Sequence, residues 1–136
     1  MFSWLRICPL VLLLLVGCSS SSSKPAEGPA AQDKLREVGE LLSIYSGEFR
    51  RGPARVADLA RYEQGYPLGY QAILTGEIVV IWGATMPGEG DQTGTEVIVA
   101  YEKQTPTEGG SVLLHNRQVR KLTAAEFASM PKFTKS

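Results

Sequence analysis

Few side chains in this sequence are of the types that carry nucleophilic or acid–base chemistry. His115 is the single histidine of the chain. It is expected at a hairpin tip, where a lone histidine is usually a solvated turn residue. A nucleophile requires a base within hydrogen-bond reach and a third group that orients the base. Ser43, Ser46 and Ser111 lack the Gly-x-Ser-x-Gly context of a nucleophile elbow. We therefore assign no catalytic residue from the sequence.

A glycine-rich stretch, residues 83–94, carries carboxylates suited to contact a ligand. Glu89 and Asp91 lie within it, and Glu96 lies just beyond. Carboxylate oxygens are ligands that Ca²⁺ prefers, but dedicated calcium loops alternate their carboxylates regularly. This stretch does not, and it also lacks the Lys and Ser/Thr that end a phosphate-binding loop. We expect no metal and no cofactor, and we treat Glu89 and Asp91 as a candidate binding surface.

Three tyrosines at four-residue intervals form a second candidate surface. Tyr62, Tyr66 and Tyr70 would make an aromatic stripe on a helix. Two glycines and a proline between them argue against a continuous helix. On a loop, such rings either stack on sugars or anchor the loop to the core, and anchoring is the commoner role.

The first eighteen residues have the pattern of an export signal. Arg6 precedes an apolar run, Ile7 to Val16, which only Cys8 and Pro9 interrupt. About ten helical residues at about 1.5 Å each span half of a hydrocarbon core of about 30 Å, which is too short for a stable transmembrane helix. A positive start, a brief apolar segment and a small-residue exit are typical of a signal peptide that is removed after export.

The exit, Leu15-Val16-Gly17-Cys18, resembles the lipobox of bacterial lipoproteins. The resemblance implies cleavage between Gly17 and Cys18, lipidation of the Cys18 thiol and anchoring to a membrane through acyl chains. It also implies a place in the cell envelope, facing the periplasm or the cell exterior. Ser19 after the lipidated cysteine favours the outer membrane over the inner membrane. An ordinary secretory signal with a chance cysteine is the alternative.

Charge and cysteine content narrow the class of the exported chain. Removal of Arg6 from a balance of 14 basic and 14 acidic side chains leaves one net negative charge, which argues against nucleic-acid partners. Cys8 leaves with the signal, so no disulfide is expected although the compartment is oxidising. Stability must therefore come from one modest apolar core.

Composition divides the exported chain into a tether and one domain. Residues 18–31 contain too few apolar side chains to bury, so we expect the lipidated Cys18 to be followed by a flexible Ser/Pro/Ala/Gly tether. Residues 32–133 are expected to form a single globular α+β domain, and residues 134–136 a tail.

Two helices are expected at the start of the domain. Apolar residues recur at three- and four-residue steps and predict a helix from Gln32 to Ser46, with Asp33 as N-cap and Gly47 as the stop. A short second helix is expected to begin with Pro53 near its first turn and to include Val56, Leu59 and Tyr62. The neighbouring arginines are interpreted as a solvated charge cluster rather than as a site for anionic lipid or glycan. They are Arg50, Arg51 and Arg55.

The remaining elements are mostly extended. Residues 103–110 are expected as a loop, and Asn116-Arg117 as a two-residue hairpin turn. Thr123 with Glu126 forms a capping box that opens a final helix ended by Pro131. The expected extended segments are Gln71–Leu74, Ile78–Trp82 as a buried central strand, Glu96–Tyr101, Ser111–Leu114 and Gln118–Lys121. The fold class is α+β: an N-terminal helix packed on a small antiparallel sheet of about four strands, and a short C-terminal helix.

Two stretches resemble known proteins. Residues 35–82, with the Asp58-Leu59 step and Pro67–Tyr70 before a Trp-ended strand, are similar to small bacterial envelope lipoproteins of unknown function. Residues 99–127 are similar to the C-terminal domain of type II secretion pseudopilin-like proteins, whose tail carries an Asp-Gly-His hairpin. His115-Asn116-Arg117-Gln118 occupies that hairpin here, so the family's role for it does not transfer. The lipobox also replaces the pilin-type N-terminal helix.

These patterns favour a lipid-anchored envelope lipoprotein with a non-catalytic binding or scaffolding role and an envelope protein or glycan as partner. An accessory component of a type II secretion system is the alternative, and it predicts a first helix that begins well before Asp33. An enzyme with an unrecognised site is the third hypothesis. It requires a deep pocket with convergent polar groups around His115 or around Glu89 and Asp91.

Overall fold

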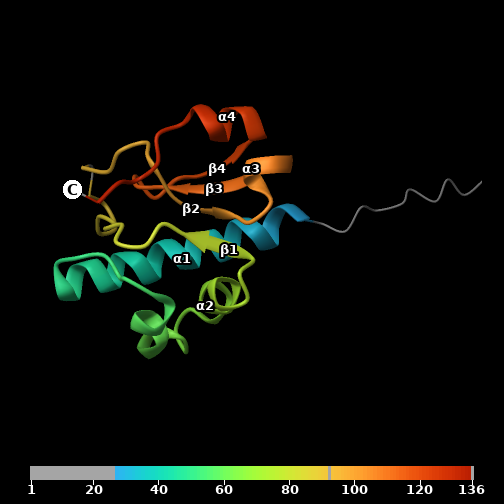
Figure 1. The fold of residues 1–136 in the computed structure, drawn as a ribbon. Coiled ribbons are helices and arrows are strands. Elements are labelled where there is room, and N and C mark those ends of the chain that lie inside the picture. Colours follow the sequence, from blue (N-terminus) through green and yellow to red (C-terminus); the bar gives the residue numbers. More distant parts are fainter. Residues whose placement is uncertain (1–26, 92, 136) are drawn as a thin grey trace, which may run out of the picture.

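The computed structural model describes residues 27–91 and 93–135. The predictions for the signal segment, for cleavage and lipidation at Gly17 and Cys18, and for most of the tether lie outside the described residues. Figure 1 shows the arrangement of the elements. In chain order they are the helix α1 (Glu27–Phe49), the 3-10 helix η1 (Val56–Tyr62), α2 (Pro67–Leu74), β1 (Ile78–Val80), β2 (Ile98–Glu102), α3 (Thr105–Glu108), β3 (Gly110–Leu114), β4 (Val119–Leu122) and α4 (Ala124–Ser129).

The architecture is α+β, as the sequence predicts. The strands form one antiparallel sheet in the order β1-β2-β3-β4. The long helix α1 covers one face of the sheet, with α2 beside it, and α4 lies over the opposite face (Figure 1). The sheet is therefore the middle of three layers. None of the described helices combines the length and the apolar content needed to cross a membrane.

Alternating side chains of the sheet enter two apolar clusters, because successive residues of a strand point to opposite faces. The cluster under α1 includes Leu113 together with Leu35 and Leu42 of the helix. The cluster under α4 includes Val112 and the final-helix residue Phe127. The Phe127 ring meets Tyr101 edge-on, with 4.8 Å between centroids.

The apolar stripe predicted for α1 is confirmed as its buried face. Its members Leu35, Val38, Leu41 and Leu42 have no exposed surface, and Tyr45 is 5% exposed. The helix is longer than predicted at its start, since residues 27–31 belong to α1 rather than to the tether. Alanines there favour a helix, and the proline in the first turn removes an N–H that would have no partner inside the helix.

The predicted ends of α1 are wrong. Asp33 lies inside the helix, where its Oδ1 accepts a hydrogen bond of 2.9 Å from Arg36. Gly47 does not stop the helix, because a single glycine costs only about 1 kcal/mol there and the adjoining residues are held by packing. The helix ends at Phe49, after which Arg50 adopts a positive φ of 59°.

The extended segment predicted at Gln71–Leu74 is wrong, because these residues belong to α2. Pro67 occupies the first turn of that helix, a position where its missing N–H costs nothing. Gly69 lets α2 approach α1 closely: a Cβ there would lie 2.8 Å from the Val38 nitrogen. Its N–H also donates to Glu37 Oε2 at 2.8 Å. Tertiary packing on α1 thus outweighs the local preference for a strand.

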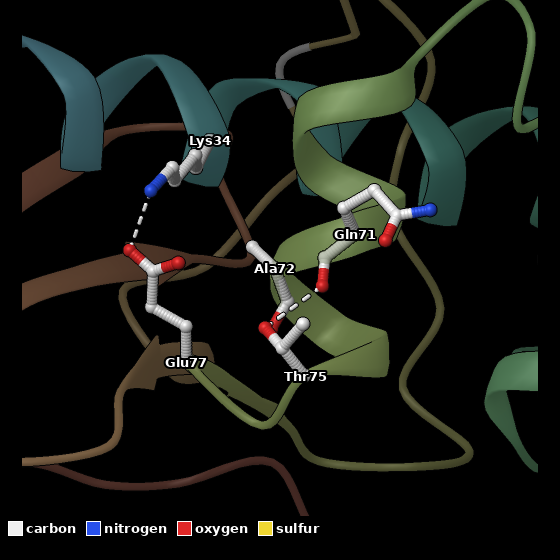
Figure 2. A network of polar contacts seen from close by, with 5 residues as sticks. All are labelled: Lys34, Gln71, Ala72, Thr75 and Glu77. Carbon is white, nitrogen blue, oxygen red and sulfur yellow. Dashed lines mark hydrogen bonds and ion pairs between the residues drawn. The ribbon is translucent and has the colours of Figure 1, made fainter.

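Polar contacts secure the C-terminal end of α2 and the residues that follow it. Figure 2 shows Lys34 of α1 paired with Glu77, which follows α2, at 2.6 Å. It also shows the Thr75 hydroxyl donating to the backbone carbonyl oxygens of Gln71 and Ala72 at the C-terminal end of α2. These bonds satisfy carbonyls that a helix end leaves without intrahelical partners.

The first strand lies at an edge of the sheet, so its prediction as a central strand is wrong. Ile78 and Val80 are buried because they belong to the apolar cluster that α1 and α2 also enter, not because strands flank β1 on both sides. β1 ends at Val80, and beyond it Ile98 pairs with the C-terminal segment in parallel. Ile98 N donates to the Pro131 carbonyl at 3.0 Å, and Phe133 N donates to the Ile98 carbonyl at 2.9 Å.

The pairing of β3 with β4 is confirmed, but the predicted turn is too short by one residue. Leu114 N donates to Gln118 O, and Arg117 N donates to Leu114 O. The loop is therefore His115-Asn116-Arg117, and Arg117, not Asn116, has the positive φ of 71°. A type I turn followed by a left-handed residue is the usual three-residue hairpin.

The capping box at the start of α4 is confirmed. Thr123 Oγ1 accepts from Glu126 N at 3.1 Å, and Glu126 Oε1 accepts from Thr123 N at 3.2 Å. The stretch between β2 and β3 was expected as a loop, and it contains the single-turn helix α3.

Candidate binding site at the end of α1

A shallow cavity of about 380 Å³, broadly open to solvent, lies where three segments meet. The last turns of α1, the loop between β1 and β2, and the hairpin tip contribute its walls. The polar or charged lining residues are Ser43, Ser46, Arg50, Thr85, Asp91, Thr93 and His115. They are far apart in the chain, so only the tertiary fold brings them together.

Two serines of α1 hold the loop between β1 and β2 against the helix. Ser46 Oγ accepts a hydrogen bond of 3.1 Å from Met86 N, and Ser43 Oγ donates to Pro87 O at 3.1 Å. Ser46 is 9% exposed and Met86 is 3% exposed. The two hydroxyls therefore hold the loop in place as one wall of the cavity.

The hairpin tip holds the same loop from the other side. Arg117 Nη1 donates to Pro87 O at 3.1 Å, and Arg117 Nη2 forms an ion pair with Glu40 of α1. The Arg117 side chain is only 19% exposed. Gly94 permits this arrangement, because a Cβ there would lie 2.5 Å from the Asn116 Cα.

His115 is fixed as a hydrogen-bond acceptor through one ring nitrogen. Thr95 N donates to His115 Nδ1 at 3.1 Å, so the neutral imidazole carries its proton on Nε2. Partial burial lowers the pKa of His115, and the nearby charge of Asp91 opposes that shift. The neutral ring therefore carries an Nε2–H donor, and His115 is one of the residues that line the cavity.

Asp91 is an exposed acceptor that also lines the cavity. Its Oδ1 accepts from Thr93 N at 2.9 Å. Hydrogen bonds from the Thr93 backbone, and next from its side chain, lower the pKa of Asp91, with a smaller contribution from His115. The structure thus brings Asp91 and His115 to one cavity, whereas Glu89 is exposed and does not line it.

Ser43 and His115 do not have the hydrogen-bond arrangement of a serine hydrolase. In a serine hydrolase, Nδ1–H donates to a carboxylate and Nε2 takes the serine proton. Here Nδ1 accepts from a backbone N–H, and the Ser43 proton is donated to Pro87 O. The described residues also contain no group of three or more His, Cys, Asp or Glu placed to hold a metal ion. The donors and the acceptor suit non-covalent recognition.

The three tyrosines anchor their segment to the core. Tyr70 is 8% exposed, and Tyr62 and Tyr66 are half-buried against the cluster under α1. The Tyr62 hydroxyl donates to Glu48, and desolvation, followed by that bond, raises the Tyr62 pKa. Their rings do not form one exposed stacking face, so this part of the candidate surface is not assembled.

A second cavity, of about 620 Å³, lies at the other end of the sheet, beside α3 and α4. Glu102, Glu108 and Lys121 are among its lining residues. The buried Thr105 Oγ1 nearby has no hydrogen-bond partner among the described residues. Sequence reasoning missed this cavity, because α3 was expected as an irregular loop.

Comparisons with known proteins add no relatives. No family model matches the chain, and no curated protein and no solved structure matches it. The site is therefore interpreted from its own geometry.

Proposed function

We propose that this protein is a lipid-anchored lipoprotein of the bacterial cell envelope with a non-catalytic binding role. Cys18 carries the lipid, and the membrane holds the chain through it, with the outer membrane favoured. The α+β domain presents the cavity at the end of α1 to a ligand or partner in the envelope.

The position of that cavity relative to the anchor carries the proposal. Residues 19–26 separate the proposed lipid from α1, which begins at Glu27. With 23 residues at about 1.5 Å each, α1 is about 34 Å long. The cavity lies at its far end, beside Ser43, Ser46 and Arg50. The recognition groups therefore lie at the end of α1 that is farther from the proposed anchor.

The chemistry of the cavity supports binding more than catalysis. It combines a guanidinium, a neutral imidazole donor and a carboxylate, and its serine hydroxyls hold the loop. A concave site with a few converging polar groups is typical of small-ligand recognition.

The anchor is tested by intact mass and membrane partitioning of the wild type beside Cys18→Ala in a bacterial host. We expect the wild type to lose residues 1–17, gain acyl mass and fractionate with membranes, while the variant does none of these. Release of both forms as unlipidated soluble protein would contradict the proposal. Separation of the inner and outer membranes then tests the location.

A second candidate is an accessory role in a type II secretion system. The observation that favours it is the start of α1 at Glu27, six residues before Asp33. Co-expression with pseudopilins and in-cell cross-linking from the exposed face of α1 tests it. A specific cross-link between Arg36→Cys and a pseudopilin supports this role. Labelling equal to that at the control Glu89→Cys, which is exposed in the loop near the other end of α1, contradicts it.

A further inference from the structure

Two arginines of the described chain adopt a backbone conformation that favours glycine. Arg50 has φ 59° and Arg117 has φ 71°, and no other non-glycine residue in the described part has a positive φ. Bulky side chains rarely adopt this conformation, and such strain persists where the surrounding structure or a function requires it. Both residues border the loop between β1 and β2.

Contacts within the fold explain the strained backbone of Arg117 but not that of Arg50. The Arg117 guanidinium pairs with Glu40 and donates to the Pro87 carbonyl, so its side chain joins the hairpin to α1 and to the loop. The Arg50 side chain makes no ion pair and no hydrogen bond to any residue that the structure describes. It instead lines the cavity at the end of α1. A glycine at position 50 would end the helix with less strain.

The groups around Arg50 define the chemistry of a ligand. The guanidinium suits a carboxylate, which it can bind through two parallel hydrogen bonds. The Nε2–H of His115 adds a neutral donor. Asp91 faces the same cavity and suits an ammonium group, since its carboxylate retains acceptor sites besides the one that Thr93 uses. Opposite charges on one cavity match a ligand that carries both.

We propose that this cavity binds a zwitterion, a free amino acid or a short peptide, with Arg50 on its carboxylate and Asp91 on its ammonium group. His115 donates from Nε2 to a carboxylate or amide oxygen. A volume of about 380 Å³ lies near the lower end of ligand sites, which hold about 300–1,000 Å³. This inference names the ligand class of the cavity and rests on the proposed binding function. A simple anion fits less well, because Asp91 repels it.

The probe is tri-alanine, titrated into the purified full-length chain in detergent. Calorimetry gives the affinity, and the His115 imidazole resonances report binding at the cavity. We expect saturable binding, with an affinity at least tenfold lower for N-acetyl-tri-alanine, which lacks the ammonium group, and for tri-alanine amide, which lacks the carboxylate.

Matched variants separate binding from folding. Arg50→Gly removes the guanidinium and the backbone strain together, so we expect a folded protein with at least tenfold weaker binding. Arg51→Gly is the control, because Arg51 is exposed, adjacent to Arg50 and outside the cavity. This variant should bind tri-alanine with the affinity of the wild type. Gly47→Leu gives a second variant, because a Cβ at 47 meets no atom within 4 Å. Its side chain should occupy the cavity without disturbing the helix.

Several results would overturn the inference. They are the absence of saturable tri-alanine binding, equal binding of the blocked peptides, unchanged affinity in Arg50→Gly, and tighter binding of inorganic phosphate than of the peptide. Failure here is distinguishable from failure of the anchor. If the protein is lipidated and membrane-bound but does not bind tri-alanine, only the proposed ligand class is contradicted. If it is unlipidated but binds tri-alanine, only the proposed anchor is contradicted.

Discussion

The hairpin tip and the C-terminal end of α1 hold the same loop, and each contains an arginine in left-handed backbone. At the hairpin, Arg117 is largely buried and bonded to Glu40 and Pro87. At the helix end, Arg50 is exposed and lines a cavity. The same left-handed backbone conformation therefore occurs in two arginines with different roles. One arginine stabilises the fold, and the other is available to a ligand.

Replacement of the hairpin arginine is expected to have the largest effect. Arg117→Ala removes the ion pair and leaves Glu40, whose side chain is 33% exposed, without its cation. The free energy of unfolding should fall by about 2 kcal/mol, as measured by urea denaturation.

The control for that change is Arg120→Ala. Its ion pair with Glu96 spans 3.0 Å between side chains that are 40% and 64% exposed, so about 0–0.5 kcal/mol should be lost. Equal losses in the two variants would show that the hairpin contact is an ordinary surface pair.

The serine contact at the helix end comes next. Ser46→Ala leaves the buried Met86 N–H without its acceptor, and unfolding should become easier by about 1 kcal/mol. Ser43→Ala should cost less, since Pro87 O keeps the bond from Arg117. The reverse ranking would mean that the loop depends on Ser43 rather than on Ser46.

Glycine at the two strained positions tests the comparison directly. Arg50→Gly should raise the free energy of unfolding by about 0.5 kcal/mol, because it relieves left-handed strain and loses only the favourable charge near the helix C-terminus. Arg117→Gly relieves similar strain but loses its contacts, so it should destabilise the protein. Thermal unfolding of both variants measures the sign of each change in stability. A loss of stability in Arg50→Gly would mean that the Arg50 side chain stabilises the fold.

The smallest expected effect is a pH dependence from His115. Burial lowers its pKa in the folded state below the ordinary value of 6.5, so the unfolded chain binds a proton more readily. This contribution to stability is complete above pH 6.5 and is lost as the pH falls towards the folded pKa. Denaturation of the wild type and His115→Asn at pH 7.5 and pH 5 should show a smaller decline for the variant. Parallel declines would remove His115 as the cause.

Local sequence patterns correctly predicted the buried face of α1 and the start of α4. The stripe from Leu35 to Tyr45 identified the buried face of α1, and Thr123 with Glu126 identified the start of α4. The prediction of an extended segment at Gln71–Leu74 was wrong, because close contact with α1 at Gly69 stabilises these residues as part of the helix α2. The edge position of β1 was also missed, because burial against helices gives the same apolar run as burial between strands.

The candidate site was only partly predictable. Asp91 was singled out as a candidate ligand contact, and His115 was noted as the only histidine, but their proximity depends on how the loop crosses the hairpin at Gly94. Arg50 was grouped with a solvated cluster, since nothing local distinguishes it from Arg51. The distinguishing feature is its φ, which depends on where α1 ends, and Gly47 suggested the wrong end.

The pairing of the C-terminal segment with Ile98 has a consequence for how the protein resists self-association. Pro131 and Phe133 satisfy the backbone groups of Ile98 at the point where β1 stops, and Lys132 Nζ lies 4.3 Å above the Phe127 ring. An unpaired strand edge is a template for another chain. Proteolytic trimming after Met130 would uncover this edge, so the last residues protect the sheet against self-association.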